Sequence, residues 1–302
     1  MTEVVQELVV GVDGSEASEH ALRVALHEAA TTHEAVRVLH TWTVPASGSM
    51  TAYSMDFPGL QSPLRQETAE GFLDDIVRAA QRDVGDLDVQ LVQDVHAGDA
   101  GTELLRAAEH ADLLVIGARQ HGGLLSAVLG SATNYVLHHA TCPVMVVPAS
   151  TAPVTSWARV VVGVDGSETG DAALRWGADR ARAHGCPLLA VHAWQLITNP
   201  DWYGVPATSA SSYAKEVESW LREHVDTALA GVSDGLSVEV RAVQDQAASG
   251  LLLSTGPDEL LVVGSRGRGG FADLVLGSVA MQCAHHARSA VAVVRPTKDA
   301  SR

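Results

Sequence analysis

The chain has 302 residues, of which 46% are hydrophobic and 19% charged. This is the composition of a compact globular protein long enough for about two domains, and it argues against a disordered chain. The formal net charge of −16 argues against nucleic acid as the main ligand, because a phosphate backbone is bound through a basic face.

Cysteines and terminal residues indicate the compartment. Cys142, Cys186 and Cys283 are odd in number and have no CxxC spacing, which favours reduced thiols over a disulfide framework. The N-terminus carries acidic residues where a signal peptide needs basic ones, and no stretch has the apolar length of a membrane span. We therefore expect a cytoplasmic protein.

The sequence is a tandem duplication. Val10–Glu16 reads VGVDGSE, and Val162–Glu168 repeats it 152 positions later. Trp42 recurs as Trp194 at the same offset, and Gly130-Ser131 recurs as Gly277-Ser278 at an offset of 147. A repeat of this length predicts two similar domains.

Each copy alternates short β-rich runs with amphipathic helical segments. In the first copy, we predict strands at Glu7–Val12, Ala35–Thr41, Asp88–Val95, Asp112–Ile116 and Pro143–Val147, and helices at Ser18–Thr32, Leu64–Val84, Gly101–Glu109 and Ser131–His139. In the second copy, we predict strands at Val160–Val164, Pro187–Ala193, Ser237–Val243, Glu259–Val263 and Ala290–Val294, and helices at Gly170–His184, Ser212–Ala230, Ala248–Thr255 and Ser278–His286.

This alternation predicts an α/β fold in which each half is a five-stranded parallel sheet with helices on both faces. Domain 1 is expected at 1–148, a linker at 149–157, domain 2 at 158–296 and a tail at 297–302. In doubly wound sheets, ligands bind outside the carboxyl ends of the strands. Asp13 should therefore lie near Gly117, and Asp165 near Gly264.

The strongest functional pattern is Leu260–Ser278, LLVVGSRGRGGFADLVLGS. A strand is followed by a glycine-rich loop and then by a helix start, which together can form an anion site from free backbone amides and the helix dipole. The loop glycines would let the backbone approach a phosphate and adopt positive φ. Arg266 and Arg268 would add charge-assisted bonds, and the Ser278 hydroxyl would bond the terminal phosphate.

Motifs of catalysis are missing from the chain. No GxxxxGK[ST] loop occurs, and VDGSE stands where a dinucleotide-binding GxGxxG would follow the first strand. Group transfer also needs a carboxylate that binds a metal ion and a positioned nucleophile, and no motif in the sequence indicates either. The sequence therefore does not predict an enzyme.

Asp13 and Asp165 each follow a first strand. Either carboxylate could accept from ribose hydroxyls, or it could cap the next helix, because Asp-Gly-Ser-Glu has the spacing of a capping box. Both roles fit. Gly11 and Gly163, just before, would give an adenine ring close access to the backbone.

The histidine pairs 138–139 and 285–286 do not predict a metal site. Adjacent side chains on a helix point about 100° apart, so they do not readily share one ion. We expect them to interact with the dipole at a helix end. Trp42 and Trp194 are expected in the core or the pocket wall, and Cys142 as a buried small hydrophobe.

Both halves resemble universal stress protein domains, over nearly the whole chain. The resemblance is carried by VGVDGSE in each half, by GSRGRGGFADLVLGS in the second and by HHATCPVMVV at the end of the first. The family signature G-x2-G-x9-G-[ST] is matched in full by Gly264, Gly267, Gly277 and Ser278.

The resemblance implies two tandem Rossmann-like domains with sheet order 3-2-1-4-5, and ATP at the strand ends with Mg²⁺ held by the phosphates. It also implies dimerisation through the last strand, here a homodimer with intramolecular domain pairing, and a regulatory role in stress response or growth control. The alternatives are a nucleotide-free dimeric interaction scaffold and a slow ATPase. No nucleic-acid or membrane partner is expected.

The first half departs from the signature, because Gln120 stands where the second glycine belongs. A side chain there would remove positive-φ freedom and crowd the phosphates, so nucleotide binding is expected mainly in the second half. The candidate nucleotide-binding residues of the first half are Gly11, Asp13, Gly117, Arg119, Gly122, Gly123, Gly130 and Ser131. Those of the second half are Gly163, Asp165, Gly264, Ser265, Arg266, Gly267, Arg268, Gly269, Gly270, Gly277 and Ser278.

Overall fold

The computed structural model describes residues 6–43, 62–120, 127–149, 155–195, 207–232, 235–267 and 276–296. The first half contains β1 (Glu7–Val12), α1 (Glu16–Thr32), β2 (Ala35–Trp42), α2 (Ser62–Val84), β3 (Leu91–Ala97), α3 (Ala100–Ala107), β4 (Leu113–Gln120), β5 (Ala127–Val128), α4 (Ser131–His139) and β6 (Val144–Pro148). The second contains β7 (Val160–Gly163), α5 (Glu168–Ala183), β8 (Leu188–Trp194), α6 (Ala207–Ala228), β9 (Val238–Gln244), α7 (Ala247–Leu253), β10 (Leu260–Gly264), α8 (Ser278–His286) and β11 (Val291–Val294).

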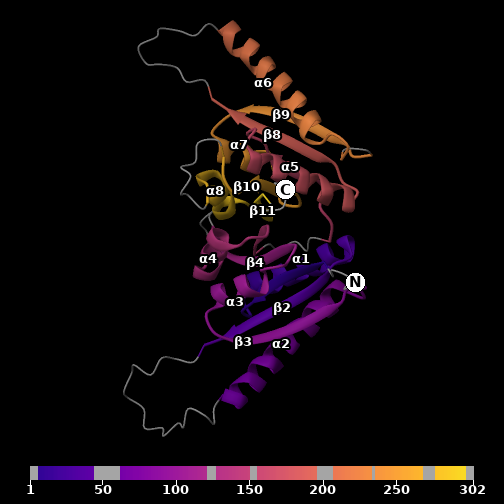
Figure 1. Ribbon diagram of the computed structural model, residues 1–302, viewed down its shortest axis with the longest axis vertical. Coiled ribbons are helices and arrows are strands. Elements are labelled where there is room, and N and C mark those ends of the chain that lie inside the picture. Colours follow the sequence, from indigo (N-terminus) through magenta and orange to yellow (C-terminus); the bar gives the residue numbers. More distant parts are fainter. Residues whose placement is uncertain are drawn as a thin grey trace, which may run out of the picture.

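The two halves share one continuous sheet, ordered β3-β2-β1-β4-β6-β11-β10-β7-β8-β9. Each half has the predicted order 3-2-1-4-5, with β6 as the fifth strand of the first half, because the short β5 pairs antiparallel with β4 beside this path. Neighbours within each half are parallel, whereas β6 and β11 pair antiparallel where the halves meet. The halves therefore stack along the long axis of the molecule (Figure 1).

Helices cover both faces of the sheet. Alternate strand residues face opposite sides, so that Leu8 and Val10 pack in one core cluster with α1, α2, α5 and α6, while Val9 packs in the other with α3, α4, α7 and α8. The central strands are almost entirely apolar, as expected for parallel strands buried on both faces. Among the described residues, no helix combines the length and hydropathy needed to cross a membrane.

The predicted elements are confirmed, with shifted ends. The third strand was predicted at Asp88–Val95 but occupies Leu91–Ala97, because its ladder with β2 begins where Leu91 pairs with Val36. Residues 87 and 89 continue the apolar alternation and pack against the core without joining that ladder. Strand pairing, not local alternation, therefore fixes the start of β3.

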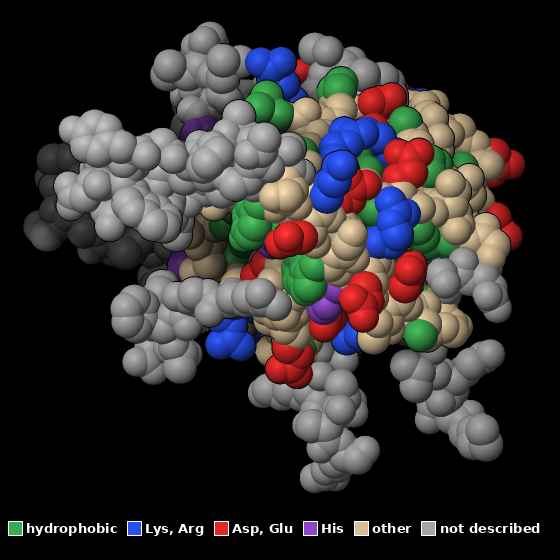
Figure 2. Space-filling view, turned by 90° about the horizontal axis from the view of Figure 1, so that it is seen from above, with side chains coloured by type: hydrophobic (Ala, Val, Ile, Leu, Met, Phe, Trp, Pro, Cys, Tyr) green, Lys and Arg blue, Asp and Glu red, His purple; other side chains and the backbone are tan. Residues whose placement is uncertain are grey.

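Charge is evenly mixed at one end of the molecule. Figure 2 looks along the long axis onto that end, and acidic and basic side chains lie interspersed there among the described residues. Charged pairs of the second half include Arg222 with Glu218 on α6 and Arg182 with Asp179 on α5.

Candidate functional site

A cavity of about 640 Å³ opens in the second half at the carboxyl ends of β7 and β10. Its volume falls in the range of small-molecule sites. Its lining includes seven of the residues predicted from the sequence: Gly163, Asp165, Gly264, Arg266, Gly267, Gly277 and Ser278. The fold thus brings the end of the first strand and the glycine-rich motif to one place, 99 residues or more apart in the chain. Arg268, Gly269 and Gly270 lie outside the described residues.

The turn after β7 orients Asp165. Its Oδ1 accepts from the backbone amide and the hydroxyl of Ser167, at 3.0 and 2.6 Å, and Gly166 between them has a φ of +72°. Ser167 in turn caps α5 by accepting from the amide of Gly170 at 3.1 Å. The N-cap of α5 is therefore Ser167 and not Asp165, two residues earlier. Asp165 orients the capping serine through Oδ1, and its other oxygen, Oδ2, faces Gly267 after β10.

Two glycines make room for the Asp165 carboxylate. A Cβ added to Gly170 would lie 2.6 Å from Oδ1, and a Cβ added to Gly267 would lie 2.7 Å from Oδ2. Gly267 itself has no positive φ, so its role differs from the conformational freedom predicted from the motif. A side chain at the second glycine of the signature would therefore displace this carboxylate.

The first signature glycine has a packing role. A Cβ on Gly264 would lie 2.9 Å from the carbonyl carbon and oxygen of Thr169, in the first turn of α5. Its equivalent, Gly117, would meet the Ala17 carbonyl oxygen at 2.5 Å in the first turn of α1. Neither glycine has a positive φ. Glycine is required here because the end of the fourth strand touches helix backbone.

The backbone of Ser265 links the two ends of the glycine-rich motif. The residue is buried, its amide donates to the Val294 carbonyl at 2.7 Å, and its carbonyl accepts from the amide of Gly277 at 2.7 Å. Its backbone thus ties β10 to β11 and to the start of α8. Gly277 is the N-cap of α8 and supplies no side-chain cap, so the first-turn amides beside Ser278 keep their donor capacity toward the cavity.

The cavity floor is apolar. Leu251 of α7 covers Gly163, because a Cβ on that glycine would lie 2.9 Å from a Leu251 methyl group. Leu104 of α3 covers Gly11 in the same way. Each glycine thus accommodates a leucine, and in the second half Leu251 and Gly163 both line the cavity.

His192 is a cavity residue that the sequence analysis missed. Its Nδ1 lies 2.7 Å from the Val164 carbonyl oxygen, and its ring meets Trp220 of α6 edge-on at 4.9 Å. His40 makes the equivalent contact with the Val12 carbonyl at 2.9 Å. The sequence does contain a signal for this residue, because a histidine recurs two positions before both Trp42 and Trp194. Trp194 itself is buried and packs against Tyr213, as expected of a core residue.

The first half lacks the space that holds Asp165. Ser18 stands at the position of Gly170, where its hydroxyl donates to the Ser15 carbonyl at 2.9 Å and accepts from the Asp13 amide at 3.2 Å. Asp13 is exposed, whereas Asp165 is half-buried. Gln120 stands at the position of Gly267. The two glycines that frame Asp165 are thus both replaced.

The main chain is paired on either side of residues 121–126 in the first half. Arg119 and Gln120 form an antiparallel ladder with Val128 and Ala127 of β5. Gly130 is the uncapped N-cap of α4, and Ser131 is its exposed first residue, as in the second half. Gly122 and Gly123 lie outside the described residues.

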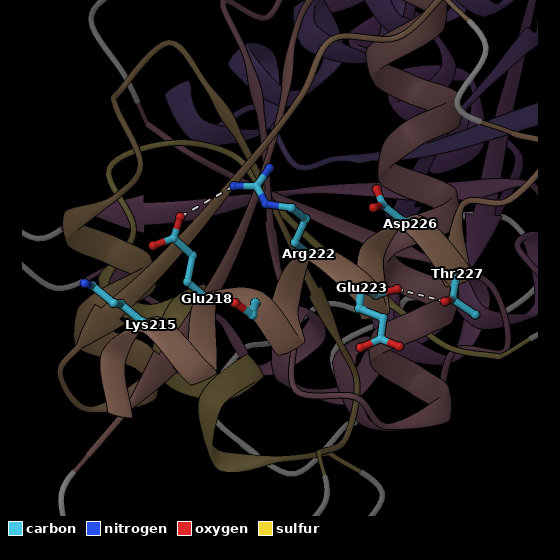
Figure 3. Close-up of a pocket in the computed structure, with 7 residues that line it drawn as sticks. Lys215, Glu218, Arg222, Glu223, Asp226 and Thr227 are labelled. Atoms are coloured by element: carbon cyan, nitrogen blue, oxygen red, sulfur yellow. Dashed lines mark hydrogen bonds and ion pairs between the residues drawn. The ribbon is translucent and has the colours of Figure 1, made fainter. Parts of the chain in front are cut away.

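The other polar clusters of the described residues give weaker evidence of a functional site. His138 and His139 lie in the last turn of α4, His285 and His286 in that of α8, and no group of metal-ligating side chains occurs within the ranges that the structure describes. A second hollow, about 730 Å³, lies along α6 (Figure 3). Its lining comes from that one helix, and Glu218 and Arg222 pair with each other across 3.5 Å, so its charges do not converge on a ligand.

Comparison with known proteins identifies relatives of the whole chain. The profile of the universal stress protein family matches residues 5–148 and again residues 156–295. A universal stress protein of Mycobacterium tuberculosis is 30% identical over 300 residues, covering 95% of this chain and 96% of its own. One of Mycolicibacterium smegmatis is 29% identical over 296 residues, covering 96% and 97%. The crystal structure of a universal stress protein from Archaeoglobus fulgidus has a TM-score of 0.68 at 17% identity, covering 97% of this chain and 99% of that one, which shows a shared fold.

Proposed function

Because the chain belongs to the universal stress protein family, we propose that its second half binds an adenine nucleotide, ATP, and that the protein acts as a nucleotide-dependent regulator of stress response or growth. The observation that carries this proposal is the 640 Å³ cavity, which joins an oriented carboxylate, an uncapped helix start and an apolar floor.

Each part of the cavity suits one part of the ligand. The first-turn amides of α8 and the Ser278 hydroxyl bind the phosphates, with Arg266 adding positive charge. Asp165 accepts from the ribose hydroxyls. The adenine ring packs on the apolar floor formed by Leu251 and its neighbours. Arg268, Gly269 and Gly270 are included as phosphate-binding residues on the sequence pattern alone.

Magnesium enters with the nucleotide in this proposal. Among the described residues, the cavity lining contains one carboxylate, Asp165, which already holds the turn before α5. Mg²⁺ prefers phosphate oxygens and water together with one or two carboxylates. The phosphates are therefore its main ligands.

The proposal gives one nucleotide to each chain. In the first half, Ser18 and Gln120 replace the glycines beside the aspartate, and the end of β4 pairs with β5. Domain 1 (1–148) then serves chiefly as the partner of domain 2 (158–296), joined by the linker 149–157 and followed by the tail 297–302. The protein works in the cytoplasm, as a homodimer of such chains, without catalysis.

The test is to denature the purified protein and identify any released nucleotide by mass spectrometry, and then to titrate the emptied protein with ATP and Mg²⁺ while recording its Tm. We expect adenine nucleotide at about one per chain and a rise in Tm on adding ATP. Gly277→Val, which fills the approach to the α8 amides, should abolish both.

The outcomes separate the alternatives. Absence of nucleotide together with an unchanged Tm would reject the proposal in favour of a nucleotide-free scaffold. ATP turnover that disappears in Gly277→Val would make the protein a slow ATPase. Full occupancy in that variant would place the site elsewhere.

A further inference from the structure

Another cavity, of about 870 Å³, lies where the two halves meet. The first half contributes the end of α1 with Glu34 and the turn at Cys142, and the second half contributes α5 with Arg180 and the segment after β11 with Arg295. We call it the seam cavity. It exists only while the halves are paired, and it does not share lining residues with the cavity of the second half.

Arg180 leaves one of its donors unused in this cavity. Its side chain is only 8% exposed and lies over the Trp176 ring, 4.9 Å from the centroid. One terminal nitrogen, Nη2, donates to Oε1 of Glu34 at 3.3 Å. The other, Nη1, is buried without a partner. A buried guanidinium with an unmet N–H is costly unless something accepts from it.

Glu34 is the second unmet group. Its side chain is 5% exposed, and its Oε2 is buried without a partner. Burial raises the pKa of this carboxyl above its usual value, even though Arg180 acts to lower it. When the carboxyl is protonated, it can also donate a hydrogen bond.

Arg295, which follows β11 in the second half, is the third unmet group. One terminal nitrogen, Nη2, donates to the Leu137 carbonyl of α4, which belongs to the other half. Its Nη1 is buried without a partner. Among the described residues, five buried side-chain atoms lack a partner, and three of them belong to residues that line the seam cavity. The unmet hydrogen bonds are therefore concentrated here.

The unmet groups define the chemistry of an occupant. Two are guanidinium N–H donors, which match the oxygens of carboxylate and phosphate. A cation offers the two guanidinium donors no acceptor, and an apolar ligand would leave all three atoms unsatisfied. The rim also carries Glu109, Asp112 and Asp179, which disfavour a highly charged anion such as a nucleoside triphosphate. The site suits a small anion of low charge.

We propose that the seam cavity binds a small oxyanion, a carboxylate or inorganic phosphate, between Arg180 and Arg295. The anion accepts from Nη1 of each arginine, which come from α5 and from the segment after β11. Because α1, Glu34 and the turn at Cys142 form the opposite wall, the bound anion also holds the two halves together. This site is separate from the proposed nucleotide site and does not depend on it.

The experiment is calorimetric titration of the full chain with sodium phosphate and, separately, with sodium acetate, at constant ionic strength set with sodium chloride. The protein is first saturated with ATP and Mg²⁺, and the titration is repeated in Gly277→Val. We expect saturable binding of one anion per chain in both. Arg295→Gln should weaken it at least tenfold, since that variant removes a charged donor while its present bond is to a single carbonyl.

Variants distinguish the outcomes. Arg180→Lys keeps the charge beside Glu34 and should weaken binding as Arg295→Gln does. Arg222→Gln, on the exposed face of α6, is the matched control and should bind as the unmodified chain does. Binding that is lost only in Gly277→Val would place the anion at α8 and overturn the proposal. So would binding unchanged in both seam variants, or no saturable heat with either anion, which would leave a cavity that holds water alone.

Discussion

Glu28 and Arg180 occupy the same position in the two repeats, 152 residues apart, yet carry opposite charges and are both buried where the halves meet. The Glu28 carboxylate accepts from the Trp157 indole at 2.9 Å and lies 2.9 Å from Nε2 of His184. Arg180 pairs with Glu34. Each half thus supplies charges that only the unlike half can match: pairing two first halves would bury Glu28 against a second Glu28.

We predict that Glu28→Gln lowers the free energy of unfolding by about 1–3 kcal/mol, because the buried charged acceptor of Trp157 and His184 is lost. Chemical denaturation with urea measures the change. Glu218→Gln is the control, since Glu218 makes an exposed pair with Arg222 on one helix and should change stability by about 0.5 kcal/mol or less. An equal loss of unfolding free energy in the two variants would contradict a stabilising role for the buried Glu28 carboxylate.

The two seam carboxyls should have opposite effects on the pH dependence of stability. Burial by itself raises the pKa of Glu28, but its bond with His184, the charge of Arg180 and the bond from Trp157 together hold that pKa below 4.5. Its contribution is therefore present above about pH 4.5 and is lost as the pH falls through the lowered value. Burial raises the pKa of Glu34, so ionising it costs stability as the pH rises from 4.5 through the raised value.

Unfolding free energies measured across pH 3 to 8 test both signs. Glu28→Gln should flatten the acid side of the profile, whereas Glu34→Gln should flatten the rise in cost above pH 4.5. If Glu28→Gln instead changed the profile above pH 4.5, and Glu34→Gln changed its acid side, the directions of the two pKa shifts would be wrong.

Gly267→Ala should weaken ATP binding about tenfold with little effect on stability. The new methyl group would lie 2.7 Å from Oδ2 of Asp165, and the carboxylate can move aside because it ends a side chain. Affinity is measured by calorimetry and stability by Tm. Gly71→Ala, in α2, is the control, because its Cβ would meet nothing within 4 Å. Unaltered affinity in Gly267→Ala would remove Asp165 from the proposed ribose contact.

Gly264→Ala should instead destabilise the fold by about 1–3 kcal/mol, with or without nucleotide. Its Cβ would lie 2.9 Å from the backbone of Thr169, which cannot move independently of α5. Urea unfolding of the nucleotide-free protein measures this loss. A variant as stable as the parent would show that the contact between β10 and α5 relaxes freely.

Thiol reactivity should follow burial. Burial raises the pKa of Cys142 to about 11 and that of Cys283 to about 12, so both should resist alkylation at pH 8 in the folded protein. Cys186 is only half-buried and should react first, although burial raises its pKa too. Mass spectrometry after a timed iodoacetamide pulse gives the order, with urea-unfolded protein as the reference in which all three react.

Much of the architecture could be predicted from the sequence because the duplication doubles each local signal. The sheet order followed from the family resemblance, and the joining of Asp165 with Gly264 followed from parallel topology. The reason for the glycine at 267 could not be predicted. It depends on where a carboxylate 102 positions earlier points, which local sequence does not encode. His192 was missed because a lone histidine near a strand end has no motif around it.

The antiparallel contact of β6 with β11 also bears on how the chain folds. Val146 pairs with Val291, 145 positions away, whereas the strand neighbours inside each half are closer in sequence. Closing so long a loop is entropically slow, so each half should complete its own sheet before the two dock. Until docking, β6 and β11 are open edges able to capture strands of other chains. The step most exposed to aggregation is therefore the last one, and the buried charges at the seam select its correct partner.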